Sequence, residues 1–249
     1  MQWTPLQTDD GSWTLRRERD GATCHSTAGA WTQARERYAG PCRLAELGRE
    51  RGVVRLLEVG TGLGLNIAAA LHALAPSGAR LEVCTLELDS AVIEASLRLP
   101  QSEDCARWLE PVHRALRAAL EHADGSARGF EAGNGTLQLV LGDAASALER
   151  LTPASFDAVF FDPFAPADEP RLWTRAVLAS VARAMAPHAI LSTYSAALEV
   201  RASLAAAGLR VGQGPRVGRK AQGTLASFTA SLPPLHPRLA RRIAVRAAR

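Results

Sequence analysis

Short apolar runs alternate with helical segments from residue 53 onward, and this alternation constrains the fold more than any other feature. The predicted strands cover 54–59, 81–88, 137–141, 158–161 and 189–194, and the predicted helices cover 65–74, 90–97, 144–151, 171–185 and 196–207. Successive strand–helix units build a parallel sheet with right-handed crossovers. The sequence therefore predicts an α/β fold with a doubly wound, mostly parallel sheet of seven strands. Residues 209–214 and 224–232 are predicted to add a terminal antiparallel hairpin.

Three segments lie outside this alternation. Residues 1–52 are predicted to be an N-terminal extension, with short strands over 13–17 and 22–25 and a helix over 31–51, that packs on a main domain of residues 53–232. Residues 100–135 form an insertion in that domain, predicted as a helix over 103–122 and a glycine-rich loop. Residues 233–249 are predicted to be a basic tail.

The charge of the chain is unevenly distributed. The net charge is +4, but residues 200–249 contain ten basic residues and no acidic residue. Arginine is abundant throughout the chain, so its segregation to one end is more informative than its number. A basic face is the electrostatic footprint of a polyanion partner. A solvated basic tail with no partner is an equally good interpretation of the last dozen residues.

Composition excludes several classes of protein. The chain is 47% hydrophobic and 22% charged, which suits a compact globular fold. Its four cysteines lack C-x-x-C spacing and its histidines lack ligand spacing, which argues against a metal site and a disulfide scaffold. No apolar run approaches the ~20 residues of a membrane span, and the first residues do not resemble a signal peptide. The sequence therefore predicts a cytoplasmic protein without a membrane span, and leaves its oligomeric state open.

The loop after the first predicted strand has the pattern acidic-x-G-x-G-x-G. Glycines between a strand and a helix let the backbone turn tightly and approach a ligand closely. A carboxylate here would repel the diphosphate of a dinucleotide but attract the ammonium and sulfonium charges of S-adenosylmethionine. We therefore expect that cofactor here, the alternative being a tight turn with nothing bound. The candidate contacts in this segment are Glu58, Gly60, Thr61, Gly62, Gly64 and Asn66.

Acidic residues also end the next three strands. Glu87 ends the second strand and is placed to accept hydrogen bonds from ribose hydroxyls, and Asp143 follows the third. Asp162 ends the fourth strand and begins a rigid Asp-Pro-Phe step. This step is similar to the D-P-P-Y pattern of methyltransferases that act on exocyclic amines, in which a carboxylate and a carbonyl hold the amine while the ring stacks on a base. The alternative is a turn at Asp162 and a core position for Phe164.

The order of several segments resembles that of the MnmC-like tRNA methyltransferases, from about residue 13 to residue 231. The segments are LLEVGTGLGLN, LELD, LGDA, FDAVFFDPFAPADEPRLWT, LSTYSAA and GPRVGRKA. The most specific block is matched by Asp162, Phe164, Ala165, Pro166, Pro170, Trp173 and Thr174. The resemblance implies a Rossmann-like class I S-adenosylmethionine-dependent methyltransferase. Its substrate would be tRNA, in which it converts the 5-aminomethyl group of wobble (2-thio)uridine to 5-methylaminomethyl.

The resemblance also implies roles for single residues. Glu58 and the three loop glycines would surround the methionine end of the cofactor, Glu87 would hold the ribose, and Asp143 would meet the adenine. Asp162 would face the transferred methyl group and the acceptor amine. Bifunctional members carry an additional FAD-dependent oxidase domain, whereas this chain has no second glycine-rich fingerprint. The resemblance is therefore to the stand-alone methyltransferase form, and no FAD is expected.

The candidate catalytic residues are Asp162, which would orient the amine, and Tyr194 at the end of the fifth strand. For Tyr194, a buried ring with a satisfied hydroxyl is the alternative. Phe164 is the candidate for stacking on the base, and Arg219 and Lys220 are the candidates for phosphate contacts, or else part of a solvated turn. Two other functions remain open. A polyamine-type aminopropyltransferase would need acidic side chains for a polycationic substrate, and a non-catalytic RNA-binding module would not need Asp162.

Overall fold

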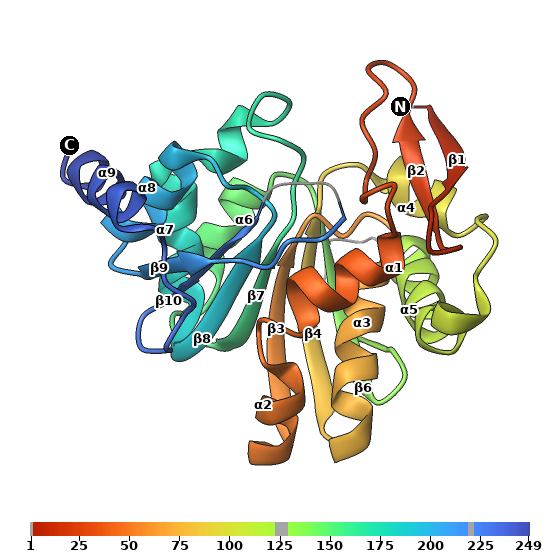
Figure 1. Ribbon diagram of the computed structural model, residues 1–249. Helices are drawn as coiled ribbons and strands as arrows, with labels where there is room; N and C mark the ends of the chain where they lie inside the picture. Colours follow the sequence, from red (N-terminus) through yellow and green to blue (C-terminus); the bar gives the residue numbers. More distant parts are fainter. Residues whose placement is uncertain (1, 123–128, 219–221) are drawn as a thin grey trace.

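The computed structural model describes residues 2–122, 129–218 and 222–249. At its centre lies a sheet with the strand order β5-β6-β4-β3-β7-β8-β10-β9 (Figure 1). The parallel strands of this sheet are β3 (Val53–Val59), β4 (Arg80–Glu87), β6 (Gly135–Leu141), β7 (Phe156–Phe161) and β8 (Met185–Thr193). The prediction of a doubly wound, mostly parallel sheet is therefore confirmed.

The edges of the sheet are antiparallel. Strand β10 (Thr224–Ser227) pairs with β8, and β9 (Arg210–Gln213) pairs with β10, which confirms the predicted terminal hairpin. The predicted number of seven strands is wrong, because the described residues form eight in this sheet. The additional strand is β5 (Phe130–Glu131), which pairs with β6 inside the predicted glycine-rich loop. A strand of two residues is too short to show the alternation of apolar and polar residues that predicts a strand. The pairing of β5 is determined only by the exposed edge of β6.

Two hydrophobic clusters cover the two faces of the sheet. Strand side chains alternate between them, so that Leu56 and Phe160 lie in one cluster and Leu57 and Phe161 in the other. The first face carries α1 (Ala30–Gln33), α2 (Leu44–Glu50), α3 (Leu65–Leu74), α4 (Ser90–Ser96) and α5 (Glu103–Glu121). The second carries α6 (Ala144–Arg150), α7 (Arg175–Ala184) and α8 (Leu198–Ala206), so helices lie on both sides of the sheet (Figure 1).

The N-terminal segment differs from its prediction in two places. The helix expected over 31–51 is interrupted: α1 continues as a π-helix (Ala34–Ala39), and α2 starts only after a turn in which Arg43 has a φ of +56°. Pro41, which cannot donate a helical hydrogen bond, lies in that turn. The strand expected over 22–25 is reduced to one bridge, Arg16 with Thr23, while β1 (Trp3–Gln7) and β2 (Trp13–Arg17) form a separate hairpin.

The C-terminal segment, expected as a basic tail, contains a helix, α9 (Pro237–Ala247). His236 caps its first turn through a hydrogen bond from the backbone N–H of Arg238, and Pro237 occupies the first helical position. Ile243 is buried, and α9 packs beside α8 (Figure 1). None of the described helices is both long enough and apolar enough to cross a membrane.

Candidate active site

A cavity of about 750 Å³ opens where the parallel strands end. The loop after β3, the ends of β4 and β7, and residues 21–25 of the N-terminal segment contribute to its wall. It therefore lies at the edge of the sheet where open α/β folds bind ligands. The predicted site residues that line it are Gly60, Thr61, Gly62, Glu87, Asp143, Asp162, Phe164 and Tyr194. Glu58, Gly64 and Asn66 are not part of this lining, and Arg219 and Lys220 lie outside the described residues.

The glycine loop lies directly beside Asp162. Strands β3 and β7 pair with Val59 opposite Phe161, so the residues that follow them are neighbours. Gly60 has a φ of +90°, and a Cβ atom on it would lie 2.6 Å from the carbonyl oxygen of Asp162. Only glycine therefore allows the loop to lie this close to the end of β7. This close approach brings the glycine loop against the backbone of Asp162, the candidate catalytic residue, at the cavity wall.

Glu87 is held firmly at the end of β4. Its carboxylate accepts hydrogen bonds from three backbone N–H groups, those of Gly62 (3.0 Å), Leu88 (2.8 Å) and Asp89 (3.2 Å). Burial raises the pKa of Glu87, and these three donors partly oppose that rise. Oε1 accepts two of these bonds and Oε2 only one, so Oε2 keeps acceptor capacity, which suits a ribose hydroxyl group.

Asp143 lies in the cavity wall and also caps α6. Its carboxylate accepts hydrogen bonds from the Ser146 hydroxyl (2.7 Å) and backbone N–H (3.2 Å), and these bonds lower the pKa of Asp143. The Asp143 carboxylate is therefore already hydrogen-bonded to the N-terminal turn of α6, at the wall of the cavity. Its contact with an adenine remains a prediction.

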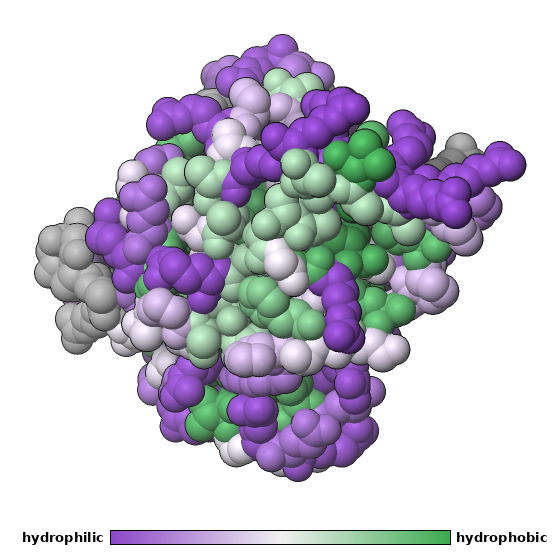
Figure 2. Space-filling model, turned by 90° about the vertical axis from the view of Figure 1, so that its left-hand side faces the viewer, coloured by the Kyte–Doolittle hydropathy of each residue, from purple (hydrophilic) through white to green (hydrophobic). Residues whose placement is uncertain are grey.

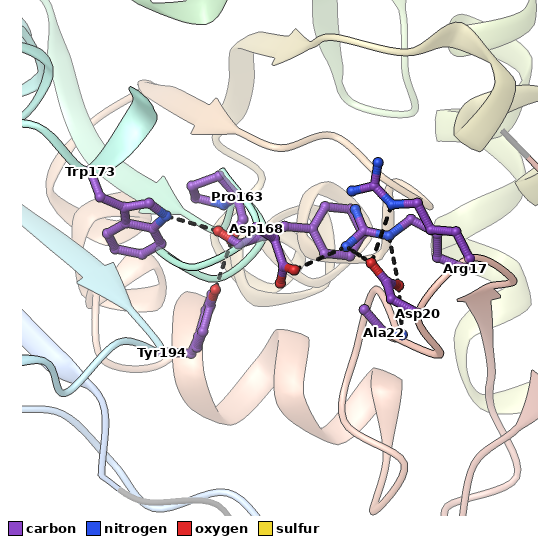
Figure 3. Close-up of polar contacts among 9 residues, drawn as sticks. Arg17, Asp20, Ala22, Pro163, Asp168, Trp173 and Tyr194 are labelled. Carbon is purple, nitrogen blue, oxygen red and sulfur yellow. Dashed lines mark hydrogen bonds and ion pairs between the residues drawn. The ribbon is translucent and has the colours of Figure 1, made fainter. Parts of the chain in front are cut away.

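Asp162 is surrounded by polar groups from three other elements. The Asn66 side chain of α3 donates a hydrogen bond to its Oδ2 atom at 3.0 Å. Burial, and then the Asp162 carboxylate, raise the pKa of Tyr38, which is fully buried in the π-helix. The same two causes raise the pKa of Tyr194. The Tyr194 hydroxyl donates to the carbonyl oxygen of Pro163 at 2.9 Å, as Figure 3 shows. This geometry fits the alternative of a satisfied hydroxyl better than a proton-transferring Tyr194.

The N-terminal hairpin contacts the ring of Phe164, which lines the cavity. The ring stacks with Trp3 at a centroid distance of 5.9 Å, and the guanidinium carbon of Arg17 lies 4.2 Å from its centroid. Arg17 is itself fixed by ion pairs with Asp20 (2.8 Å) and Asp168 (3.5 Å), visible in Figure 3. Stacking of Phe164 on a base remains a prediction, and it would have to coexist with these contacts.

Glu58 lies beneath the glycine loop rather than in the cavity. It is fully buried and accepts a hydrogen bond from the Thr85 hydroxyl at 2.7 Å, and Thr85 in turn bonds Thr61 of the loop at 2.6 Å. Burial raises the pKa of Glu58 well above its usual value. Its Oε1 atom and the Oδ1 atom of Asn66 are both buried acceptors without a hydrogen-bond donor among the described residues. Glu58 is therefore placed to support the loop from below, and its burial favours the neutral form of the carboxyl group.

We expect Glu58→Gln to change how stability depends on pH. Because the folded-state pKa of Glu58 lies above its usual value near 4.5, the folded state binds this proton more tightly than the unfolded state. The free energy of unfolding of the wild type therefore falls as pH rises from the unfolded pKa to the folded pKa, by up to about 1.4 kcal/mol per pH unit. Glutamine lacks this proton, so the stability of Glu58→Gln should rise relative to the wild type as pH rises above the usual pKa near 4.5. Urea unfolding of both proteins at several pH values measures this difference in stability. If the stabilities of wild type and Glu58→Gln changed with pH in the same way, Glu58 would be ionised in the folded protein and the expectation would be wrong.

Two residues that the sequence did not single out complete the site. Arg37 lines the cavity, and Tyr38 lies next to Asp162. Both belong to the π-helical segment, an element found frequently at functional sites. The helical pattern of residues 31–51 gave no sign of a π-helix. Among the described residues no group of three or more His, Cys, Asp and Glu side chains is arranged to hold a metal ion.

Comparison with known proteins identifies the family. Residues 107–229 match the family described as "S-adenosyl-L-methionine-dependent methyltransferase". The chain is 34% identical over 195 residues to the tRNA 5-methylaminomethyl-2-thiouridine biosynthesis bifunctional protein MnmC of Pseudomonas savastanoi pv. phaseolicola, a match that covers 76% of this chain and 28% of the relative. The crystal structure of MnmC2 from Aquifex aeolicus superposes with a TM-score of 0.82 at 31% identity, covering 97% of this chain and 75% of that one. The chain belongs to the MnmC family.

Membership of this family confirms the methyltransferase fold and S-adenosylmethionine as the cofactor. The cavity fits that cofactor, because it combines a glycine loop in close backbone approach with the fixed carboxylate of Glu87. A probable spermidine synthase from Corynebacterium glutamicum superposes with a TM-score of 0.55 at 15% identity, over 98% of this chain and 82% of that one, which shows a shared fold alone. The chain spans between a quarter and a third of the length of the first curated MnmC relatives.

Proposed function

We propose that this protein methylates the 5-aminomethyl group of a wobble (2-thio)uridine in tRNA, giving 5-methylaminomethyl, in the cytoplasm. The observation that carries this proposal is the position of Asp162, which lies in the cavity directly beside the glycine loop. The names of the MnmC relatives supply the substrate class. Because the chain covers less than a third of the first of those relatives, the substrate needs its own test.

The residues around Asp162 suit an amine acceptor. A primary alkylamine is mostly protonated at neutral pH, and it must lose a proton before its lone pair can attack. The bound cofactor would supply an electrophilic methyl group. Asn66 donates to the Oδ2 atom of the Asp162 carboxylate at 3.0 Å and so fixes its direction. A carboxylate held in this way would accept a hydrogen bond from the amine and aim its lone pair. Orientation is therefore the first role of Asp162.

The two alternative functions are less well supported. An aminopropyltransferase shares the fold, but the spermidine synthase likeness extends no further than that. A non-catalytic RNA-binding module would not need a carboxylate oriented beside a cofactor loop, and the family is one of methyltransferases. Incubation of the purified protein with labelled S-adenosylmethionine and tRNA that carries the 5-aminomethyl group should label that nucleoside, which mass spectrometry would identify. Transfer of label to a polyamine, or no transfer to either acceptor, would overturn the proposal.

A basic surface on α9 supports a polyanionic substrate. The helix exposes Arg238, Arg241, Arg242 and Arg246, and Arg249 is exposed just beyond its end. The guanidinium of Arg175, which begins α7, donates hydrogen bonds to the carbonyl oxygens of Arg246 (2.7 Å) and Ala247 (3.4 Å). Arg171, four residues before Arg175 in the chain, lines the cavity. Figure 2 views the side of the molecule on which α9 lies, where hydrophilic side chains border a pale-green band.

Replacing Arg242 and Arg249 with alanine should weaken tRNA binding and reduce its salt dependence. For each phosphate that the protein no longer neutralises, the slope of log affinity against log salt should fall by about one unit. The matched control is the double replacement of Arg114 and Arg117, which are exposed on α5 at the opposite end of the sheet (Figure 1). Filter binding at several salt concentrations measures both slopes. Equal slopes for the two double variants would place α9 outside the tRNA interface.

A further inference from the structure

Arg17 of the N-terminal hairpin is a buried cation that joins two segments lining the cavity. Its side chain is 2% exposed. Its Nε and Nη2 atoms donate hydrogen bonds to the two carboxylate oxygens of Asp20, at 3.0 and 2.8 Å. The Nη2 atom also lies 3.5 Å from the Asp168 carboxylate, and the guanidinium carbon lies 4.2 Å from the centroid of the Phe164 ring. A planar guanidinium suits this position, because it can pair with carboxylates and lie over an aromatic ring at the same time.

The first of these segments is the turn after β2, which leads into residues 21–25 of the cavity wall. The Asp20 carboxylate accepts a hydrogen bond from the backbone N–H of Ala22 at 3.1 Å. The backbone N–H of Arg17 donates to the carbonyl oxygen of Ala22 at 2.7 Å, and that of Gly21 donates to the carbonyl oxygen of Arg17 at 2.8 Å. Arg17 therefore holds this turn through both its backbone and its side chain.

The second segment follows β7 and carries Phe164. Its backbone is held by two aromatic side chains, as Figure 3 shows. The Tyr194 hydroxyl donates to the carbonyl oxygen of Pro163 at 2.9 Å. The indole N–H of Trp173 donates to the carbonyl oxygen of Phe164 at 2.8 Å. The backbone of this segment is thus fixed from one set of elements, whereas the ring of Phe164 is held from the N-terminal hairpin.

The order of the strands places Phe164 on the acceptor side of the cavity. The groups predicted to contact the cofactor are the glycine loop, Glu87 and Asp143, which lie at or just after the ends of β3, β4 and β6. Asp162 and Phe164 follow β7, which lies on the other side of β3 from β4 and β6. A side chain that holds the Phe164 ring should therefore affect the methyl acceptor more than the cofactor.

We propose that Arg17 is a positioning residue for the methyl acceptor. It holds the Phe164 ring in place before the acceptor binds, so that binding does not have to order the ring. Because Arg17 is buried, it acts through Phe164 and does not itself touch the acceptor. The hairpin lies outside residues 107–229, the part of the chain that matches the methyltransferase family. The proposal rests on the function proposed above, in which the acceptor is a tRNA nucleoside.

The first test is steady-state methyl transfer to tRNA that carries the 5-aminomethyl group. Arg17→Met should raise the KM for tRNA by about 5- to 30-fold, the range of a cation–π contact from partly to fully desolvated. The kcat and the affinity for S-adenosylhomocysteine should stay close to the wild-type values. Arg17→Lys keeps the charge but not the planar fork, so its KM should be intermediate. The matched control is Arg19→Met, because exposed Arg19 pairs with the same Asp20 at 3.2 Å, and its KM should stay close to that of the wild type.

The second test is a double-mutant cycle in urea unfolding, which needs no acceptor. Arg17→Met should destabilise the protein less in a Phe164→Leu background than in the wild type, because the contact with the ring is then already absent. Additive losses of stability would show that Arg17 does not hold the ring and would overturn the proposal. Should Arg17→Met fail to fold, Arg17→Lys takes its place in the cycle.

Two results of the kinetic test would also overturn the proposal. A wild-type KM in Arg17→Met would show that the acceptor does not depend on Arg17. Equal weakening of tRNA and S-adenosylhomocysteine would show that Arg17 supports the cavity as a whole. If the wild type transferred no methyl group to tRNA, the function proposed above would be wrong, and the unfolding cycle would still decide whether Arg17 holds the ring.

Discussion

Asp162→Asn is expected to slow methyl transfer by about 30- to 1000-fold. The loss is that of a charge-assisted hydrogen bond made chiefly in the transition state, which costs on the order of 2–4 kcal/mol. The contact with Asn66 explains why the substitution is harmful although it preserves shape. Asn66 donates to the Oδ2 atom of Asp162, so the new amide would turn its oxygen toward Asn66. Its NH₂ group would then face the amine, where an acceptor is needed.

Single-turnover transfer from labelled cofactor to undermodified tRNA measures this rate. The affinities for cofactor and tRNA should change little, because the side chain keeps its volume and its bond with Asn66. Glu169→Gln removes the same charge from the same cavity and should stay within a few-fold of the wild-type rate. A near wild-type rate for Asp162→Asn would make Asp162 a structural turn residue, and the amine would have to be held elsewhere.

The sheet and the residues at its carboxyl edge could be predicted because both depend on local sequence patterns. An apolar run followed by helical spacing defines a strand–helix unit, and parallel strands bring Glu87, Asp143 and Asp162 to one edge of the sheet. Each of these three residues lines the cavity. Contacts between segments distant in the sequence, such as those of Trp3 and Arg17 with the Phe164 ring, could not be predicted from these local patterns.

The position of Glu58 could have been predicted by counting along the strand. Side chains of a strand alternate between its faces, so Glu58 shares a face with Leu56 of the first hydrophobic cluster. In the register of β3 and β4, Glu58 lies opposite Thr85, its hydrogen-bond partner. The acidic-x-G-x-G-x-G pattern suggested a role for the charge of Glu58 in binding the cofactor. The alternation of side chains along β3 instead places Glu58 inside the protein.

Gly60→Ala is expected to be among the most damaging single substitutions in this fold. The residue has a φ of +90°, and a Cβ atom there would lie 2.6 Å from the carbonyl oxygen and 3.0 Å from the carbonyl carbon of Asp162. The left-handed conformation alone costs a residue with a Cβ about 1–2 kcal/mol. The clash is with backbone, which cannot rotate away as a flexible side chain does, and overpacking of this kind adds about 1–3 kcal/mol.

Gly62→Ala is the matched control for Gly60→Ala, because Gly62 has a φ of +51° and a Cβ atom there would meet nothing within 4 Å. Urea unfolding without cofactor should therefore show a loss of about 1 kcal/mol for Gly62→Ala and a loss larger by about 1–3 kcal/mol for Gly60→Ala. Because relief of the clash must push the Gly60 loop away from Asp162, Gly60→Ala should also weaken binding of S-adenosylhomocysteine. Equal losses of stability in the two variants would show that the loop can shift to relieve the clash. The close approach to Asp162 would then not explain why position 60 is a glycine.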